Sequence, residues 1–268
     1  MDLPTATRLD GKVALVTGGA GILGRRFCRG LADSGAAVAV VDMQLDAARS
    51  AARELGGIAE GFACDVADPE SVSRCVAAVL ERFGRIDVLH NNAASKSSDV
   101  RAFFTPFEDY PLSVWREVMS VNIDGMFLVA QAVGRHMIER GGGGSVIQTA
   151  SIYGLVGPDA RIYEGSDYLG GPINTPAVYA ASKAAVVGLT RWLATYWAPY
   201  GIRVNCLVPG GVSSGQNSVF AEKYSARVPL GRMAEADEMV PALLYLASPA
   251  SSYVTGQVLA VDGGWTAW

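Results

Sequence analysis

The sequence predicts an α/β protein with one doubly wound, seven-stranded parallel sheet of the Rossmann type and helices on both faces. Short apolar runs recur along the chain, each followed by a longer stretch of helical periodicity, which is the pattern of βαβ units. A glycine-rich turn at Thr17–Gly24 follows the first run. Apolar residues make up 50% of the 268 residues, which suffices for one large core.

The expected strands follow one another without an internal repeat or a linker, so we expect one domain over residues 1–268. The glycine run 141–144, after Glu139 and Arg140, is interpreted as a helix stop and turn. Strands are expected at Val13–Thr17, Ala37–Asp42, Ala59–Asp65, Ile86–Asn91, Ser145–Ala150, Ile202–Val208 and Gln257–Val261.

Charge and composition exclude several classes of partner. With 22 basic and 26 acidic residues the net charge is −4, without a block of like charge, so we expect no nucleic-acid or membrane partner. No apolar run reaches the ~18 residues of a membrane span, and Met1–Gly11 lacks the apolar region of a signal peptide, so we expect a cytoplasmic protein. The cysteines form no C-x-x-C pair, which argues against a metal site; they are Cys28, Cys64, Cys75 and Cys206.

The glycine turn is the first candidate binding site. Gly19, Gly21 and Gly24 spell G-x-G-x-x-G, and such a turn lets backbone N–H groups and a helix N-terminus bind a pyrophosphate. In a chain with 31 glycines the match alone is weak, and the alternative is an ordinary tight turn. Its place between a strand and a helix favours dinucleotide binding.

Asp42 ends the second expected strand, 18 residues after Gly24. A carboxylate there accepts hydrogen bonds from the adenosine ribose hydroxyls and repels a 2′-phosphate, so the sequence predicts NAD rather than NADP. The alternative is that Asp42 only caps the next helix.

Tyr179 and Lys183 are the candidate proton-transfer pair. Their i, i+4 spacing on a helix places both on one face, where the ammonium is expected to lower the pKa of the phenol. With 10 tyrosines and four lysines, a chance Y-x-x-x-K arises about 0.15 times in this chain, so context must support it. Ser151 supplies context, because it follows the strand 145–150 at the carboxyl edge of the sheet.

Asn122 falls on the apolar stripe of a predicted helix, and a buried amide needs hydrogen-bond partners. From the pattern alone, the simpler interpretation is a satisfied core asparagine. The stripe contains Trp115, Met119, Met126, Val129 and Val133.

Taken together and in this order, the motifs resemble the compact type of the short-chain dehydrogenase/reductase family over essentially the whole chain. The resemblance implies a catalytic tetrad of Asn122, Ser151, Tyr179 and Lys183, the asparagine holding a water of a proton relay. It implies a homotetramer built partly through the alanine-rich helix after Tyr179. It also implies cofactor contacts at Gly18, Gly21, Ile22, Leu23, Gly24, Asp42, Asp65, Val66, Asn92, Ala93, Tyr179, Lys183, Pro209, Gly210, Val212 and Ser214.

Two positions depart from the family motifs. Ile22 stands where the pattern T-G-x-x-x-G-x-G has its middle glycine, with Gly21 as its neighbour. The N-N-A-G motif ends in Ala94 instead of glycine, which a position with negative φ tolerates.

Ser151 and Tyr179 lie 28 residues apart, roughly twice the usual family distance, so a segment of about 155–176 is inserted beside the reaction centre. A second cover is expected at 213–232, with a short helix at Val219–Tyr224, because this stretch closes over substrate in the family. The segment carries four polar residues that suit a hydroxylated substrate, or that only hold the segment to itself or to another subunit; they are Asp159, Arg161, Tyr163 and Glu164.

These features predict an NAD-dependent dehydrogenase that interconverts a secondary alcohol and a ketone on a polyol or sugar-like molecule. The alternatives are a reductase of a less polar ketone or 3-oxoacyl substrate, and a non-catalytic NAD-binding regulator, which would not need all four tetrad positions. His90 and His136 are expected to be structural. Trp265 and Trp268 are assigned either to the wall of the site or to a subunit contact.

Overall fold

A computed structural model describes residues 6–168 and 170–268, so Met1–Thr5 of the expected domain and Leu169 of the 155–176 segment lie outside the described residues. Seven parallel strands form one sheet in the order β3-β2-β1-β4-β5-β8-β9, and all seven predicted strands are confirmed. Boundaries differ from prediction by at most two residues. The strands are β1 (Val13–Thr17), β2 (Ala37–Asp42), β3 (Ala59–Ala63), β4 (Val88–Asn91), β5 (Gly144–Thr149), β8 (Ile202–Pro209) and β9 (Val258–Val261).

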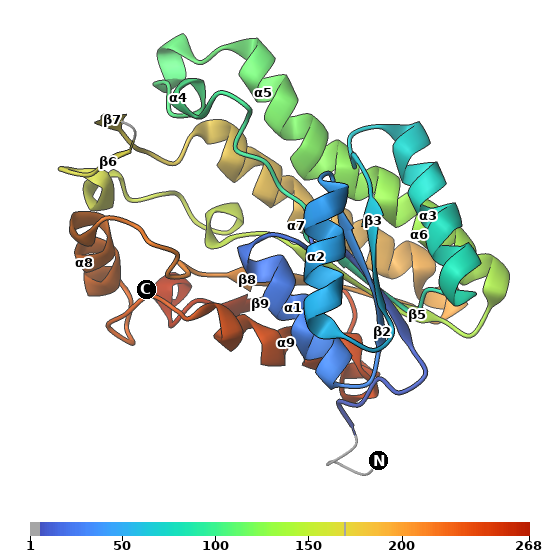
Figure 1. Cartoon of the computed structure of the whole chain (residues 1–268). Helices are drawn as coiled ribbons and strands as arrows, with labels where there is room; N and C mark the ends of the chain where they lie inside the picture. Colours follow the sequence, from blue (N-terminus) through green and yellow to red (C-terminus); the bar gives the residue numbers. More distant parts are fainter. Residues whose placement is uncertain (1–5, 169) are drawn as a thin grey trace.

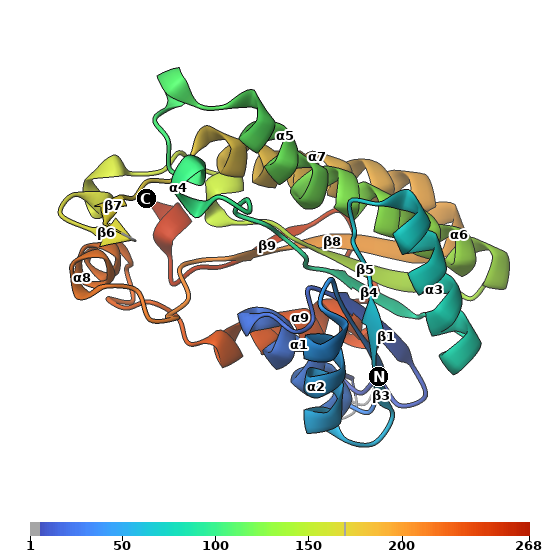
Figure 2. The same ribbon diagram turned by 45° about the horizontal axis from the view of Figure 1, so that its top comes forward.

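Helices cover both faces of the sheet (Figure 2). Consecutive residues of β5 point to opposite faces: Ile147 packs with Phe27 of α1, and Val146 packs with Trp197 of α7. Burial on both faces explains why the strands are apolar throughout. The helices are α1 (Ile22–Asp33), α2 (Leu45–Leu55) and α9 (Val240–Ala247) on one face; α3 (Pro69–Phe83), α6 (Gly125–Arg140) and α7 (Ala177–Trp197) on the other; and α4 (Val100–Phe103), α5 (Leu112–Met119) and α8 (Ser218–Arg227).

The carboxyl ends of the strands share one edge of the sheet. β1 lies between β2 and β4, so the strand order reverses beside β1, and a crevice for ligands opens at such a switch point. In Figure 1, α4, α8 and the small hairpin of β6 (Asp167–Tyr168) and β7 (Gly171–Pro172) gather beyond this edge. The hairpin was not predicted, because two-residue strands carry no periodic apolar signal.

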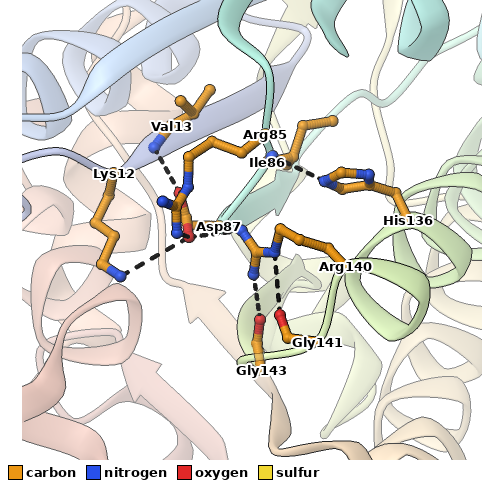
Figure 3. Close-up of polar contacts among 9 residues, drawn as sticks. All are labelled: Lys12, Val13, Arg85, Ile86, Asp87, His136, Arg140, Gly141 and Gly143. Atoms are coloured by element: carbon orange, nitrogen blue, oxygen red, sulfur yellow. Dashed lines mark hydrogen bonds and ion pairs between the residues drawn. The ribbon is translucent and has the colours of Figure 1, made fainter.

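The opposite edge is held by a buried carboxylate (Figure 3). Asp87, just before β4, accepts hydrogen bonds from Arg85 Nε at 2.8 Å, Arg140 Nη1 at 2.8 Å and the Val13 amide at 3.0 Å, with Lys12 Nζ 3.8 Å away. Burial raises the pKa of Asp87, but these hydrogen bonds outweigh it, so the pKa lies below its ordinary value. The cluster joins β1, β4 and α6, and it was not predicted from the sequence.

The glycines after α6 form the expected turn. Gly141, Gly142 and Gly143 all have positive φ, near +75°. Nearby, His136 Nε2 accepts a hydrogen bond from the Ile86 amide at 3.3 Å, which agrees with a structural role for this histidine. Among the described residues, none of the helices is long and apolar enough to span a membrane.

Candidate active site

Three of the predicted catalytic side chains meet beyond the carboxyl end of β5. Ser151 is the second residue after the strand, and its side chain hydrogen-bonds with the phenol of Tyr179, on the first turn of α7. Lys183 lies one turn later, with Nζ 5.9 Å from the centre of the Tyr179 ring. The i, i+4 spacing therefore places phenol and ammonium on one face, as predicted.

Lys183 is a buried cation, with 2% of its surface exposed. Its Nζ donates a hydrogen bond to the backbone carbonyl of Thr149, the last residue of β5, at 3.0 Å. Burial lowers the pKa of Lys183 to about 8. The strand end thus fixes the position of the ammonium.

The pKa of Tyr179 moves opposite to the sequence-based expectation. Burial raises this pKa, and the hydrogen bond with Ser151 offsets only part of that effect. The neighbouring phenol of Tyr163 adds repulsion for a phenolate. The expected lowering of the Tyr179 pKa is therefore not found in this structure, because burial of the phenol is the largest influence on it.

Asn122 is fully buried and has partners on two sides. Its Oδ1 accepts a hydrogen bond from the Ser95 amide at 2.8 Å, and its Nδ2 donates to Ser182 Oγ at 3.2 Å. It lies in a π-helical turn, Ser120–Asp124, between α5 and α6. The turn was not predicted, because the apolar spacing continues through it. The side chain is a satisfied core amide that ties the chain after β4 to α7.

The glycine turn between β1 and α1 accommodates Ile22. Gly18 has φ +62°, and a Cβ at Gly24 would overlap the Gly18 carbonyl oxygen. Gly21 caps α1 with ordinary extended backbone, and Ile22 is the first helical residue, 63% exposed. The exposed side chain of Ile22 therefore fits at the place of the family's middle glycine. No side chain caps α1 and no acidic residue lies in its first turn, where Leu23 is partly buried.

Asp42 lies beside this turn. Its Oδ2 accepts a hydrogen bond from the Ala20 amide, and its Oδ1 accepts one from the Gln44 amide, both at 3.2 Å. The residue that caps α2 is Gln44, so the alternative that Asp42 caps this helix is wrong. The carboxylate is instead held against the glycine turn.

Thr17 connects the two strands at the switch point, and sequence reasoning missed it. Its buried Oγ1 accepts hydrogen bonds from the amides of Asn92 at 2.9 Å and Ala93 at 3.0 Å. It also donates to Asn91 Oδ1 at 3.3 Å. The Thr17 hydroxyl thus holds the ends of β1 and β4 together. In the sequence, only the position of Thr17 directly before the glycine turn pointed to this role.

Ala94 fits without strain. Among the described residues, Ser97 alone combines a positive φ with a residue other than glycine, so Ala94 has negative φ. The replacement of the family's glycine is therefore tolerated, as expected.

The other predicted cofactor residues lie after β3 and β8. Asp65 is exposed, whereas Val66 is buried, with its side chain against Gly125. Gly210 follows β8, and its amide donates to the Val261 carbonyl at 2.9 Å. Pro209 ends β8, Val212 pairs with Ala234, and the exposed Ser214 contacts Gln216.

The 155–176 segment is bound to α8. Asp159 accepts hydrogen bonds from Arg161 Nε at 2.8 Å and Arg227 Nη1 at 2.6 Å. Lys223 Nζ donates to the Glu164 carbonyl at 2.7 Å and lies 3.7 Å from its carboxylate. Three of the four polar residues expected to face a substrate therefore hold the segment in place. The Asp159–Arg161 contact within the segment agrees with the alternative interpretation, whereas the contacts to α8 of the same chain were not predicted.

Tyr163 differs from those three residues. Its hydroxyl donates to the hydroxyl of Tyr153 at 3.1 Å and lies 2.5 Å from Thr175 Oγ1, while its ring stacks on Phe220 of α8 at 5.5 Å. Aromatic contact thus reinforces the ionic contact between the segment and α8.

The two C-terminal tryptophans have different positions. Trp265 is buried and stacks on Tyr224 of α8, with ring centres 4.3 Å apart. Trp268 is exposed and donates through Nε1 to the Arg227 carbonyl at 3.2 Å. Trp265 therefore supports the wall behind α8.

Comparison with known proteins gives consistent results. Residues 18–266 match the family model described as "Enoyl-(Acyl carrier protein) reductase". The chain is 38% identical to the galactitol 2-dehydrogenase (L-tagatose-forming) of Cereibacter sphaeroides, covering 100% of both chains. It is 37% identical to the D-threitol dehydrogenase of Mycolicibacterium smegmatis, covering 97% of this chain and 94% of that one.

Solved structures agree over nearly the full length. A short-chain type dehydrogenase/reductase from Mycobacterium marinum superposes with a TM-score of 0.86 at 34% identity, covering 99% of both chains. A gluconate 5-dehydrogenase from Burkholderia cenocepacia J2315, in complex with NADP and tartrate, gives 0.85 at 36% identity and 98% of both chains. An NAD+-bound xylitol dehydrogenase gives 0.83 at 33% identity, covering 95% of this chain and 99% of that one. The chain belongs to the short-chain dehydrogenase/reductase family.

Proposed function

We propose that this protein is an NAD-dependent dehydrogenase that interconverts a secondary alcohol and a ketone on a polyol or sugar-like substrate. The observation that carries the proposal is the meeting of Ser151, Tyr179 and Lys183 beyond β5, at the same sheet edge as the glycine turn. The substrate class is supported by the names of similar proteins, which act on galactitol and threitol.

Each residue has a role that its position supports. Tyr179 takes the proton of the substrate hydroxyl during oxidation and returns it during reduction. Ser151 donates a hydrogen bond to the substrate oxygen. Lys183 keeps a positive charge near the phenol and reaches the nicotinamide ribose. Asn122 positions the Ser95 loop, and we assign it the holding of a relay water.

The residues around the glycine turn fit a nicotinamide dinucleotide. A Cβ at Gly24 or Gly18 would fill the space along the turn, and the uncapped N-terminus of α1 suits a pyrophosphate. When bound, the cofactor supplies the hydride acceptor. We propose NAD over NADP because Asp42 is anchored beside the turn, where its charge opposes a 2′-phosphate. Equal kcat/KM with NADP would contradict this choice.

A substrate screen tests the function. The wild-type chain is assayed with NAD+ and galactitol, threitol, sorbitol, xylitol and cyclohexanol, and in reverse with NADH and a 3-oxoacyl thioester, following NADH absorbance. We expect the highest kcat/KM with a polyol. Preference for the thioester would favour the less polar alternative, and NAD+ binding without any turnover would favour a regulator.

The two covering segments belong to the same proposal. We assign 213–232, with α8, as the cover of the substrate, and 155–176 as the side wall to which it is bound through Asp159 and Arg227. Both belong to the single domain that we propose for residues 1–268. We also place the protein in the cytoplasm, which is supported by four cysteines that are free and buried.

A homotetramer is the proposed assembly, with α6 and α7 at one contact. On α7 the small exposed residues Ala184 and Gly188 continue into Trp192 and Tyr196, which are 58% and 56% exposed and stack on each other at 4.7 Å. A groove of about 550 Å³ separates this stripe from Phe127 on α6. An exposed apolar surface of this kind on two adjacent helices is typical of a protein contact.

A further inference from the structure

The inserted segment contributes a group of hydroxyls beside the reaction centre. Tyr163 of the segment donates to the hydroxyl of Tyr153 at 3.1 Å and lies 2.5 Å from Thr175 Oγ1, and we call these three residues the hydroxyl triad. All three residues have intermediate exposure, so none is sealed in the core. Two hydrogen bonds occupy two of the three hydroxyl protons, which leaves one O–H and several lone pairs for a ligand.

The ends of the triad adjoin the proposed catalytic residues. Tyr153 is two residues after Ser151, and its amide donates to Ser151 Oγ at 3.3 Å. Thr175 precedes Pro176, whose carbonyl accepts a hydrogen bond from the Tyr179 amide at 3.0 Å. The Tyr163 phenol also lies close enough to Tyr179 to help raise the pKa of that phenol. We therefore place the carbons next to a reacting oxygen between Ser151 and Tyr179 near the triad.

The triad is uncharged and held in place. Burial raises the pKa of Tyr153 and of Tyr163, so both phenols stay protonated. The Tyr163 ring stacks on Phe220, and the segment is ion-paired to α8. Neutral hydroxyls can both donate and accept hydrogen bonds. They therefore bind another hydroxyl better than they bind a carboxylate or an alkyl chain.

We propose that the hydroxyl triad Tyr153, Tyr163 and Thr175 is the specificity-determining subsite that recognises a second hydroxyl of the substrate, next to the carbinol that is oxidised. This inference rests on the proposed function and names the residues that favour a polyol over a monohydric alcohol. A substrate hydroxyl bound there replaces water on the triad, whereas an alcohol without it leaves these polar groups unpaired.

Two alcohols that share one carbon skeleton test the subsite. The ratio of kcat/KM for cis-1,2-cyclohexanediol to that for cyclohexanol is measured in the wild type and in Tyr163→Phe, which keeps the stacking ring. Thr175→Val removes the second hydroxyl with little change in shape, and Thr175→Ser restores it. Tyr253→Phe, at a fully exposed tyrosine, controls for loss of a phenol hydroxyl elsewhere.

We expect the wild type to prefer the diol, and the ratio to fall roughly fivefold or more in Tyr163→Phe and Thr175→Val, mainly through KM for the diol. Thr175→Ser and Tyr253→Phe should keep the wild-type ratio. If polyols are oxidised but both hydroxyl deletions keep the ratio, the triad is not the subsite, while the proposed function stands. If the wild type oxidises cyclohexanol but neither the diol nor any polyol, both proposals fail. Should Tyr163→Phe not fold, the two Thr175 variants decide.

Discussion

At the scale of single residues, burial controls protonation at the site more than charge does. Burial lowers the pKa of Lys183 to about 8 and raises that of Tyr179. Near neutral pH both groups therefore carry their protons. Reduction of a ketone uses the phenol as it stands, whereas oxidation of an alcohol needs a base, so we expect the oxidation rate to rise with pH.

Tyr179→Phe tests the role of the phenol. We expect kcat for oxidation to fall by about 10²- to 10⁴-fold, because a positioned proton-transfer group contributes on that order. The binding of NADH, followed by its fluorescence, should change little, since the ring remains. Substantial turnover in this variant, or loss of NADH binding in parallel with activity, would contradict the assignment.

His90 gives a prediction for stability against pH. Burial lowers its pKa to about 3 from 6.5, and its Nε2 lies 2.8 Å from Thr149 Oγ1. Between pH 3 and pH 6.5, His90 is protonated in the unfolded chain but neutral in the folded chain. The free energy of unfolding therefore falls as the pH falls below about 6.5. His90→Gln should reduce this slope, measured by urea unfolding, by up to about 1.4 kcal/mol per pH unit. Burial also lowers the pKa of His136, which is less buried, so His136→Gln should reduce the slope less than His90→Gln does. An unchanged slope in His90→Gln would place the acid sensitivity elsewhere.

At the scale of elements, the 155–176 segment and α8 form one unit. Asp159 receives hydrogen bonds from Arg161 and Arg227, and Arg227 also lies over the Trp265 ring at 5.2 Å. We predict that Asp159→Asn loosens the segment, because it removes the carboxylate charge that both guanidinium groups share. Cleavage by trypsin after Arg161, followed by mass spectrometry, should become several times faster. Glu222→Gln on α8 is the matched control, and equal cleavage in both variants would show that Asp159 does not hold the segment.

Local sequence patterns predicted these elements unevenly. The strands, the glycine turn and the helix expected at Val219–Tyr224, observed at Ser218–Arg227, follow from apolar spacing and glycine placement over neighbouring residues. The π-helical turn at 120–124 was not predicted, because its apolar residues continue the spacing of the flanking helices. Asp159 pairs with an arginine 68 residues away and Asp87 with one 53 residues away. Periodicity carries no information about partners at such separations.

At the scale of the whole molecule, one edge of the sheet serves the candidate active site and the opposite edge serves stability. The carboxyl edge carries the site, and the opposite edge carries Asp87 (Figure 3). Asp87→Asn leaves Arg140 without its buried anion, and we expect a loss of about 2–4 kcal/mol in the free energy of unfolding. Asp10→Asn, in an exposed pair with Arg8, should change the free energy of unfolding far less, because solvent screens that pair. Because Asp87 is remote from the site, kcat at 25 °C should be unchanged; a loss of kcat in folded protein would show coupling between the edges.

Assembly is the last property that belongs to the whole molecule. The exposed Trp192, Tyr196 and Phe127 lie on α6 and α7, away from α8 and the covering segment, so a contact there leaves the site open. Burial of three large apolar side chains per chain supplies several kcal/mol toward association.

Light scattering should give about four times the 28.1 kDa of one chain, and Trp192→Glu should lower that mass. Tyr253→Glu, on another exposed surface, should not. A wild-type mass of one chain would refute the tetramer, and a tetramer that survives Trp192→Glu and Tyr196→Glu would place its contacts on other helices.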